Sequence, residues 1–210
     1  MSDEQTVFIV DDDAAVRESL ALLLEASGFT IAQYETGNAF LEALNADSTG
    51  CLIIDVRMPG LSGLEVQKRL VDRNATLPVI IMTGHGDLPM AVKAMKAGAV
   101  DFLEKPFDLA GLTESVTNAL NKSAENLLEA NQAAEIGRRL ARLTERERQV
   151  LDELVIGNLN KVIAFNLSIS PRTVEIHRAH AMEKMQARNL AHLVRLAIAA
   201  GVVPNINAAD

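Results

Sequence analysis

Carboxylates, a hydroxyl and an amine follow short apolar runs in the first half of the chain. Asp11 and Asp12 follow the first run, Asp55 ends the third, Thr83 follows the fourth and Lys105 follows the fifth. Carboxylates gathered at one place repel one another, and a hard cation such as Mg²⁺ relieves this while also accepting water and phosphate oxygens. The amine and the hydroxyl can hold phosphoryl oxygens, and a carboxylate can act as the nucleophile. These residue types predict a phosphoryl site with Asp55 as the acceptor.

Apolar runs and helical patterns alternate over residues 1–122. Strands are expected at 6–10, 29–34, 51–55, 78–82 and 100–104, and helices at 13–28, 37–45, 64–74, 89–97 and 109–121. This alternation predicts an α/β doubly wound fold with a five-stranded parallel sheet. Ligands bind such sheets at the carboxyl ends of the strands. The polar residues above fall at that edge, so the fold would bring them together.

Asp55 allows two other interpretations. A strand-end aspartate can simply cap the turn that Pro59 and Gly60 close. A haloacid-dehalogenase-type phosphatase also forms an aspartyl phosphate, but it needs a second Asp two residues after the nucleophile, where this chain has Arg57. The sequence therefore argues against that phosphatase class and leaves the turn cap as the alternative.

Charge and composition set further bounds. The whole-chain net charge of −8 divides into −9 over residues 1–122 and +1 over residues 123–210, so only the second part is suited to nucleic acid. The single Cys51 excludes a disulfide framework and a Cys-based metal site. No apolar run approaches the roughly 20 residues of a membrane span, and the acidic N-terminus lacks the basic start of a secretion signal. We expect a cytoplasmic protein with no membrane partner.

Residues 123–142 favour a helix, because they are rich in Ala, Glu, Leu, Asn and Arg and contain no proline. They could extend the helix at 109–121, form a separate linker helix or remain flexible, with Gly137 as a candidate hinge. Beyond them, Thr144 and Glu147 have the spacing of a capping box. One helix is expected from this capping box to Gly157. Three more are expected at 160–167, 171–185 and 189–200.

The two short helices at 160–167 and 171–185, joined by a tight turn, are typical of a helix-turn-helix DNA-binding domain. Ser170 is the expected N-cap of the second helix and Pro171 its first residue. A helical packing domain without any role in nucleic-acid binding would give the same spacing. Spacing alone leaves both open.

Residues 6–122 resemble a response-regulator receiver domain, which has a CheY-like fold. The matching residues are Asp11, Asp12, Asp55, Thr83, Lys105 and Pro106. The resemblance implies that Asp55 takes phosphate from the phosphohistidine of a sensor histidine kinase. It implies that Mg²⁺ (or Mn²⁺) binds Asp12, Asp55 and the backbone carbonyl of Arg57 directly, and Asp11 through water.

The same resemblance assigns roles around the phosphate. Thr83 and Lys105 are expected to bind the phosphoryl oxygens, with a cis bond between Lys105 and Pro106. Phe102 matches the switch aromatic of the family, and as Phe it lacks the hydroxyl of the commoner Tyr. Arg57 and His85 match positions that tune dephosphorylation, although His85 could equally be an ordinary loop residue.

Residues 143–202 resemble the LuxR-type DNA-binding domain of the NarL/FixJ class, through the motifs 143–147, 160–164 and 170–177. The resemblance makes 171–185 the recognition helix, with Glu175, Ile176 and Ala179 facing base edges. The expected phosphate contacts are Lys161, Arg172, Thr173, Arg178 and Lys184. Because the family often has Lys where Glu175 stands, we expect affinity to rest on few cations and to require a dimer.

Together these resemblances imply a two-component response regulator and not an enzyme: a receiver at 1–122, a linker at 123–142 and a DNA-binding domain at 143–210. Phosphorylation is expected to move Thr83 and Phe102 and to expose a dimer face with Val92 and Lys96. The homodimer would bind promoter DNA and recruit RNA polymerase. Residues 83–102 most resemble class members that activate nitrogen-fixation genes under a haem oxygen-sensor kinase.

Two alternatives remain open at this point. One is a regulator that binds DNA without phosphorylation, although the intact acidic set argues against it. The other is a protein-interaction module whose helical domain never binds DNA.

Overall fold

The structure is a computed structural model that describes residues 5–45, 48–84 and 88–202. Contacts divide the chain into two compact units, residues 1–127 and residues 128–210, and each is considered by itself. None of the helices within the described ranges combines the length and the hydrophobicity needed to cross a bilayer.

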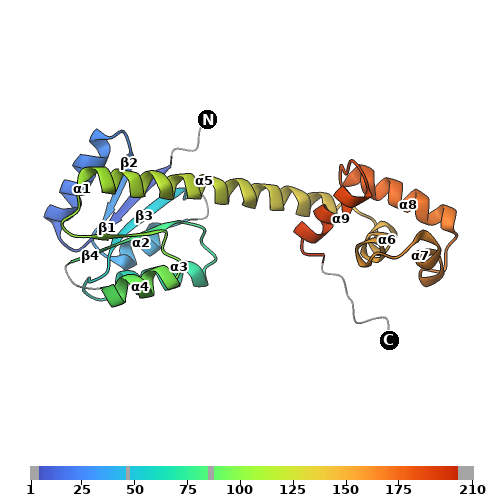
Figure 1. Ribbon diagram of the computed structural model, residues 1–210, viewed down its shortest axis with the longest axis horizontal. Helices are drawn as coiled ribbons and strands as arrows, with labels where there is room; N and C mark the ends of the chain where they lie inside the picture. Colours follow the sequence, from blue (N-terminus) through green and yellow to red (C-terminus); the bar gives the residue numbers. More distant parts are fainter. Residues whose placement is uncertain (1–4, 46–47, 85–87, 203–210) are drawn as a thin grey trace. The chain divides into compact units, whose positions relative to one another are not determined.

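The N-terminal unit contains a parallel sheet in the order β2-β1-β3-β4-β5 (Figure 1). Its elements are β1 Thr6–Val10, α1 Ala14–Ala26, β2 Thr30–Tyr34, α2 Gly37–Ala43, β3 Gly50–Asp55, α3 Gly63–Asp72, β4 Val79–Thr83, α4 Leu88–Lys96, β5 Asp101–Glu104 and α5 Leu109–Leu140. The predicted doubly wound α/β fold is confirmed.

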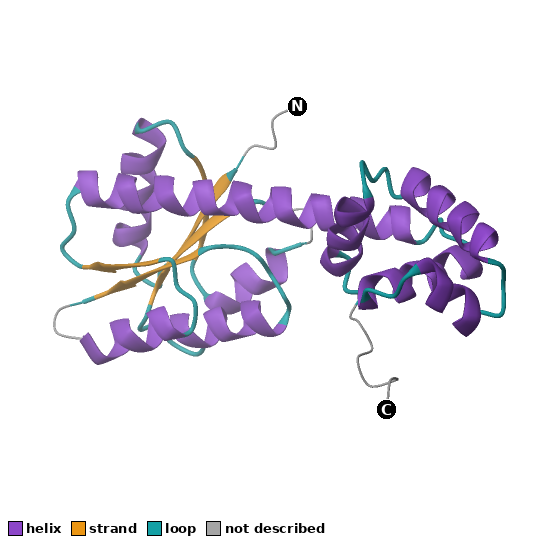
Figure 2. Cartoon of the chain, turned by 45° about the vertical axis from the view of Figure 1, so that its right-hand side comes forward, coloured by secondary structure: helices purple, strands orange, loops and turns teal. Residues whose placement is uncertain are grey.

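Helices cover both faces of the sheet, with α1 and α5 on one face and α2, α3 and α4 on the other (Figures 1 and 2). Successive side chains of a strand point to opposite faces. Ile53 therefore packs with Leu24 and Val116 on the α1–α5 face, while Ile54 packs with Phe40 on the other. Every residue of β3 and β4 is buried, which explains their continuous apolar sequences.

The strand register brings the chemically active residues to one edge. Val10 pairs with Ile54, so the residue after β1 lies beside the end of β3. Thr83 at the end of β4 pairs with Glu104, the residue before Lys105. The carboxyl ends of β1, β3, β4 and β5 thus meet, as the sequence predicted.

Helix α5 has 32 residues and extends the helix expected at 109–121 through most of the predicted linker. It continues past Gly137 to Leu140. Two of its side chains bond to other parts of the N-terminal unit. The backbone N–H of Gly50, the first residue of β3, donates to Ser123 Oγ at 3.2 Å, and Asn126 Nδ2 donates to the carbonyl oxygen of Thr76 in the loop before β4 at 3.0 Å.

The C-terminal unit contains α6 Glu145–Ile156, α7 Asn160–Asn166, α8 Pro171–Lys184 and α9 Leu190–Ala199. Val150, Ile163, Val174, Met185 and Leu193 are fully buried at its centre. Both arms of the capping box predicted for α6 are present, and α6 ends at Gly157 with φ 97°. Side chains from the last two turns of α5 also pack against this core.

Candidate functional site

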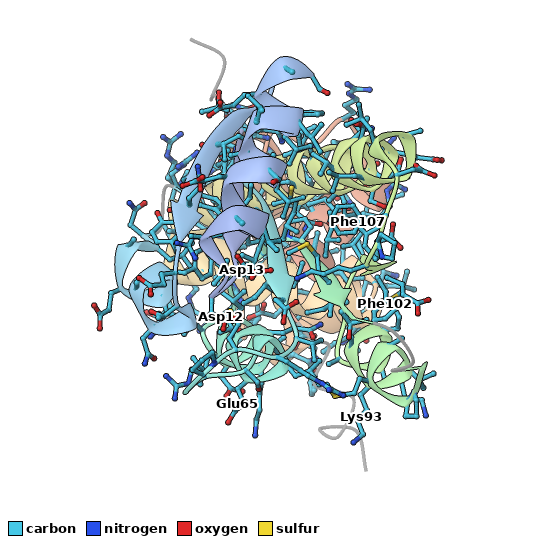
Figure 3. The ribbon with its side chains drawn as sticks, turned by 90° about the vertical axis from the view of Figure 1, so that its left-hand side faces the viewer. Asp12, Asp13, Glu65, Lys93, Phe102 and Phe107 are labelled. Atoms are coloured by element: carbon cyan, nitrogen blue, oxygen red, sulfur yellow. The ribbon has the colours of Figure 1, made fainter. Side chains whose placement is uncertain are left out.

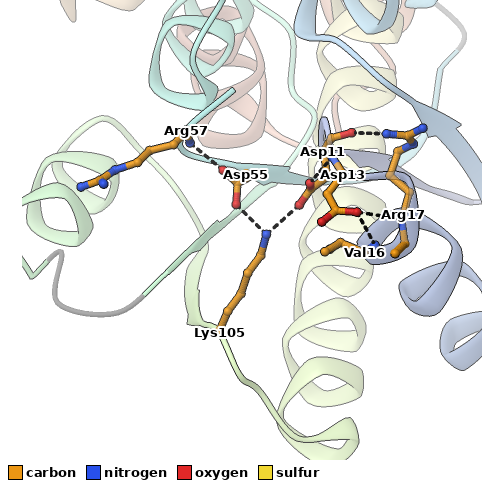
Figure 4. Close-up of polar contacts among 8 residues, drawn as sticks. Asp11, Asp13, Val16, Arg17, Asp55, Arg57 and Lys105 are labelled. Carbon is orange, nitrogen blue, oxygen red and sulfur yellow. Dashed lines mark hydrogen bonds and ion pairs between the residues drawn. The ribbon is translucent and has the colours of Figure 1, made fainter. Parts of the chain in front are cut away.

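Asp55 is the last residue of β3 and is buried at the carboxyl edge of the sheet. Its Oδ1 accepts a hydrogen bond from Lys105 Nζ at 2.7 Å, and its Oδ2 accepts one from the backbone N–H of Arg57 at 2.6 Å. The same Lys105 Nζ donates to Asp11 Oδ2 at 2.7 Å. Two buried carboxylates from adjacent strands therefore converge on one ammonium (Figure 4).

The loop after β1 is held by its own hydrogen bonds. Asp11 Oδ1 accepts from the backbone N–H of Asp13 at 2.9 Å, and the carbonyl oxygen of Asp11 accepts from an Arg17 guanidinium nitrogen at 2.7 Å (Figure 4). Asp13 caps α1 by accepting from the backbone N–H of Ala15 at 2.8 Å. Helix α1 thereby fixes the direction in which the Asp11 side chain points.

The charge of Lys105 is stabilised by its two partners. Burial alone would lower its pKa, but the hydrogen bonds to Asp11 and Asp55 outweigh burial and raise the pKa above its ordinary value. Lys105 therefore stays an ammonium at neutral pH. The bond between Lys105 and Pro106 is cis, which confirms that expectation.

Thr83 contributes a buried hydroxyl at the end of β4. It ends β4 and is 2% exposed, and its Oγ1 has no hydrogen-bond partner within the described part of the chain. The backbone N–H of Lys105 donates to the Thr83 carbonyl at 2.7 Å, which joins the two residues across the strands. A buried hydroxyl left unpaired is unusual, and it is available to an oxygen arriving at this edge.

The acidic residues suit a hard divalent cation in part. Asp11 and Asp55 are buried oxygen donors that already face a single cation, the Lys105 ammonium. Asp12 is exposed in the turn after β1 (Figure 3). Within the described ranges, no three acidic, His or Cys side chains are grouped closely enough to hold a metal. The donor chemistry fits Mg²⁺, provided that Asp12 turns inward and Lys105 releases one carboxylate.

The predicted switch residues lie on one side of the sheet. Phe102 in β5 is half-buried and packs against the core on the α2–α4 face, whereas Phe107 packs on the α1–α5 face (Figure 3). Val92 is 46% exposed on α4, and Lys96 is exposed on the same helix. His85, which matches a position that tunes dephosphorylation, lies outside the described residues.

Helix α8 has one buried face and one exposed face. Val174, Ala181 and Met185 at its C-cap are buried. The predicted base-reading residues Glu175, Ile176 and Ala179 are all exposed, so their side chains are available to a partner. Their role in reading bases stays a prediction.

The predicted phosphate contacts differ in their surroundings. Lys161 and Arg172 are exposed, whereas Thr173 and Arg178 are half-buried. The Thr173 hydroxyl lies 2.8 Å from Ser170 Oγ, and the backbone N–H of Thr173 donates to that same oxygen at 3.1 Å. Lys184 Nζ donates to Glu147 Oε2 at 2.6 Å. A DNA phosphate would have to compete with the buried Glu147 carboxylate for Lys184.

Comparison with known proteins places both units. A family model described as response regulator receiver domain matches residues 7–117, and one described as bacterial regulatory proteins, luxR family, matches residues 141–197. The transcriptional regulatory protein FixJ of Azorhizobium caulinodans is 53% identical over 204 residues, covering 97% of each chain. The chain belongs to the response-regulator family and carries a LuxR-type DNA-binding domain.

Solved structures agree with this assignment. Full-length FixJ from B. japonicum is 48% identical with a TM-score of 0.58, and the match covers 95% of this chain and 98% of that one. The response regulator StyR is 41% identical with a TM-score of 0.78, over 93% and 98% of the two chains. This response regulator is therefore a two-component regulator of transcription.

The sequence analysis missed three supporting residues of this response regulator. Arg17 holds the Asp11 loop, although its position within a helical pattern gave no signal of this. Gln67 on α3 is 1% exposed and donates through Nε2 to the Ala94 carbonyl at 3.1 Å, which ties α3 to α4. Glu147 was predicted only as part of a capping box, and its bond to Lys184 has no counterpart in the local spacing.

Proposed function

We propose that this response regulator is switched by transfer of a phosphoryl group to Asp55. The observation that carries this proposal is the buried Asp55 carboxylate, which is bonded to Lys105. It lies at the same edge as the Thr83 hydroxyl, which has no partner among the described residues. An Asp55 carboxylate oxygen attacks the phosphorus of a kinase phosphohistidine. The new O–P bond forms as the P–N bond breaks, and the imidazole nitrogen leaves with the electron pair. Water later hydrolyses the acyl phosphate to restore the carboxylate and release inorganic phosphate.

Mg²⁺ (or Mn²⁺) would be held by Asp11, Asp12, Asp55 and the backbone carbonyl of Arg57, and when bound it would neutralise charge on the incoming phosphoryl group. Lys105 then provides a second cation for the phosphoryl oxygens, and Thr83 donates its hydroxyl to one of them. Both groups already lie at the sheet edge, so binding the phosphoryl group requires side-chain adjustments only.

The switch proposed here is a shift between two conformations. When Thr83 turns toward the phosphoryl group it leaves space beside β4, and Phe102 moves into it. The face of α4 that carries Val92 and Lys96 then binds the same face of a second copy, which forms a homodimer. Two DNA-binding domains are thereby paired on a two-fold operator, while the unphosphorylated receiver restrains its own domain.

The histidine kinase is proposed to dock beside Lys105. A cavity of about 350 Å³ is lined there by residues of α1 and of the segment after β5, namely Ala15, Val16, Ser19, Leu20, Leu23, Lys105, Pro106 and Phe107. Its walls are largely apolar, as suits a helical partner, and Lys105 belongs both to the cavity and to the phosphoryl site. A docked helix could thus present its phosphohistidine to Asp55.

The proposed target is promoter DNA, read in the major groove by α8 through Glu175, Ile176 and Ala179. Lys161, Arg172, Thr173 and Arg178 would bind phosphates. The similarity to FixJ proteins supports nitrogen-fixation genes as targets, RNA polymerase as the recruited machinery and a FixL-like haem oxygen-sensor kinase as the donor. Such a regulator works in the cytoplasm, where the bacterial chromosome lies.

Analytical ultracentrifugation tests the switch. The wild-type chain is compared with Asp55→Asn, each with and without Mg²⁺ plus beryllofluoride as a phosphoryl mimic. We expect a monomer that becomes a dimer only as wild type with the mimic. A wild-type mass that the mimic leaves unchanged would contradict phosphorylation-driven dimerisation.

A further inference from the structure

One buried carboxylate connects two helices of the C-terminal unit. Glu147 is 3% exposed, and of the described residues from 128 to 202 it is the only charged one that is buried. Its Oε2 accepts from the backbone N–H of Thr144 at 2.8 Å, which completes the capping box of α6. The same oxygen accepts from Lys184 Nζ at 2.6 Å, and His180 Nδ1 lies 3.7 Å from Oε1.

Both partners on α8 lie one helical turn apart, at His180 and Lys184, beside the buried Ala181 and Met185. The carboxylate and the apolar contacts therefore hold the same end of α8. The Glu147 side chain is 4% exposed, whereas that of Lys184 is 35% exposed. Removing Lys184 would therefore leave the buried carboxylate uncompensated, which is strongly unfavourable. The bond from Lys184 to Glu147 therefore restricts the orientation of the last turns of α8 relative to the start of α6 more than apolar packing alone would.

The exposed residues that are proposed to read bases lie on the same helix, about one and a half to two and a half turns closer to its N-terminus. A helix of 14 residues is about 21 Å long and behaves as a rod. Any rotation or slide at Lys184 therefore moves Glu175 and Ile176 relative to a major groove. We propose that Glu147 is a positioning residue for the recognition helix and acts through Lys184, which is thereby an internal partner and not a phosphate contact.

This inference rests on the proposed reading of DNA by α8, and it makes a distinct prediction about salt. A lysine that neutralises a phosphate contributes to the slope of log affinity against log salt, so its loss reduces the slope by about one. Loss of a lysine that positions a helix leaves the slope unchanged and instead lowers the preference for the specific sequence. The two roles of Lys184 can thus be separated.

The experiment uses the full chain with Mg²⁺ and beryllofluoride. A duplex selected from a random pool by the wild type serves as the specific probe, and its scrambled version as the non-specific one. Affinities for both are measured between about 50 and 200 mM NaCl for Glu147→Gln, Lys184→Met and the double variant Glu147→Leu/Lys184→Met. Arg172→Met, which removes an exposed cation at the start of α8, is the matched control, and circular dichroism verifies folding.

We expect each single variant to lower the specific-to-non-specific affinity ratio by about tenfold with the salt slope unchanged. The double variant should recover part of that ratio, because it leaves no unpaired buried charge. Arg172→Met should weaken both duplexes alike and reduce the slope.

Two results would overturn the inference. A Lys184→Met slope that falls by about one, with the affinity ratio unchanged, would make Lys184 a phosphate contact. If the single variants fold and keep the wild-type ratio of specific to non-specific affinity, Glu147 acts only as a helix cap. If the wild-type chain itself selects no sequence, the proposed reading by α8 is wrong and the inference falls with it.

Discussion

At Asp55 the charge of the carboxylate is already compensated by a lysine. Lys105 is bonded to both Asp55 and Asp11, each at 2.7 Å, so it holds together two groups that would otherwise repel each other. The same ammonium is proposed to bind the phosphoryl oxygens. In this proposal Lys105 would serve both the resting site and the phosphorylated site.

Replacing Lys105 with Met should slow phosphorylation of Asp55 by about 100-fold, because one preorganised donor to the transferred group is removed. The measurement is acyl-phosphate formation with a small acyl-phosphate donor and Mg²⁺, followed by mass spectrometry. Lys122→Met, an exposed lysine on α5, is the control and should react like the wild type. Equal rates for the two variants would remove Lys105 from the proposed mechanism.

Glu147 gives a prediction about pH. Burial would raise its pKa, but the hydrogen bonds from Lys184 and Thr144 outweigh this and lower it below the ordinary value. A lowered folded-state pKa means that the carboxylate stabilises the fold fully above its unfolded pKa, and that this contribution is lost as pH falls through the folded pKa.

We therefore expect Glu147→Gln to lower the free energy of unfolding by about 2 kcal/mol at neutral pH. The difference from wild type should shrink between about pH 5 and pH 3. Urea unfolding of the full chain, followed by circular dichroism, measures both effects. Glu183→Gln, on the exposed side of α8, is the control, and a difference that stays constant with pH would contradict the assignment.

At the scale of the elements, the strands and the site edge could be predicted because their signals are local. An apolar run that ends in a polar residue gives both a buried strand and its functional end, and parallel pairing brings those ends together. Asp55, Thr83 and Lys105 were located in this way. Their bonding pattern was not, because the sequence does not show that one lysine bridges two strands.

Side-chain partners far apart along the chain were also missed. Lys184 has the charge and the helix position expected of a phosphate contact, yet its bonded partner, Glu147, lies 37 residues away in the sequence. The bond from Gln67 to Ala94 is likewise long in sequence and leaves no periodic trace. The helical course of 123–140 followed from composition, but whether it joined the preceding helix did not.

The cavity beside α1 gives a prediction for the kinase. Leu23 lines this cavity and is 38% exposed, whereas its neighbour Leu22 is 69% exposed and does not line it. Leu23→Asp should slow phosphotransfer from the kinase by about tenfold, because a charge would enter an apolar interface. Leu22→Asp is the matched control.

Phosphorylation by a small acyl phosphate should be unaffected in both variants, since no protein docks in that reaction. If Leu23→Asp slowed both donors equally, the variant would have damaged the site itself. If it slowed neither, the kinase would dock elsewhere.

At the scale of the whole molecule, the receiver domain and the LuxR-type DNA-binding domain lie in separate compact units. In our proposal, communication between them passes through the oligomeric state, which the α4 face determines. Val92→Asp should keep the chain monomeric in the presence of Mg²⁺ and beryllofluoride, because it places a charge in the apolar part of the proposed interface.

Val71→Asp is the matched control for this variant, since Val71 is a similarly exposed valine, on α3. Sedimentation of both variants with the mimic tests the interface directly. A dimer of Val92→Asp as stable as that of the wild type would place the interface on another face.

The lone cysteine has a practical consequence for observing this switch. Cys51 is completely buried in β3, and burial raises the pKa of its thiol to about 12, so at neutral pH it is present almost wholly as the unreactive thiol. Reagents that modify cysteine are therefore not expected to react with Cys51. A cysteine introduced at an exposed position in each unit could then be labelled with a fluorescent pair without altering the native chain elsewhere, and the distance between the units could be followed in real time as phosphate is added and removed.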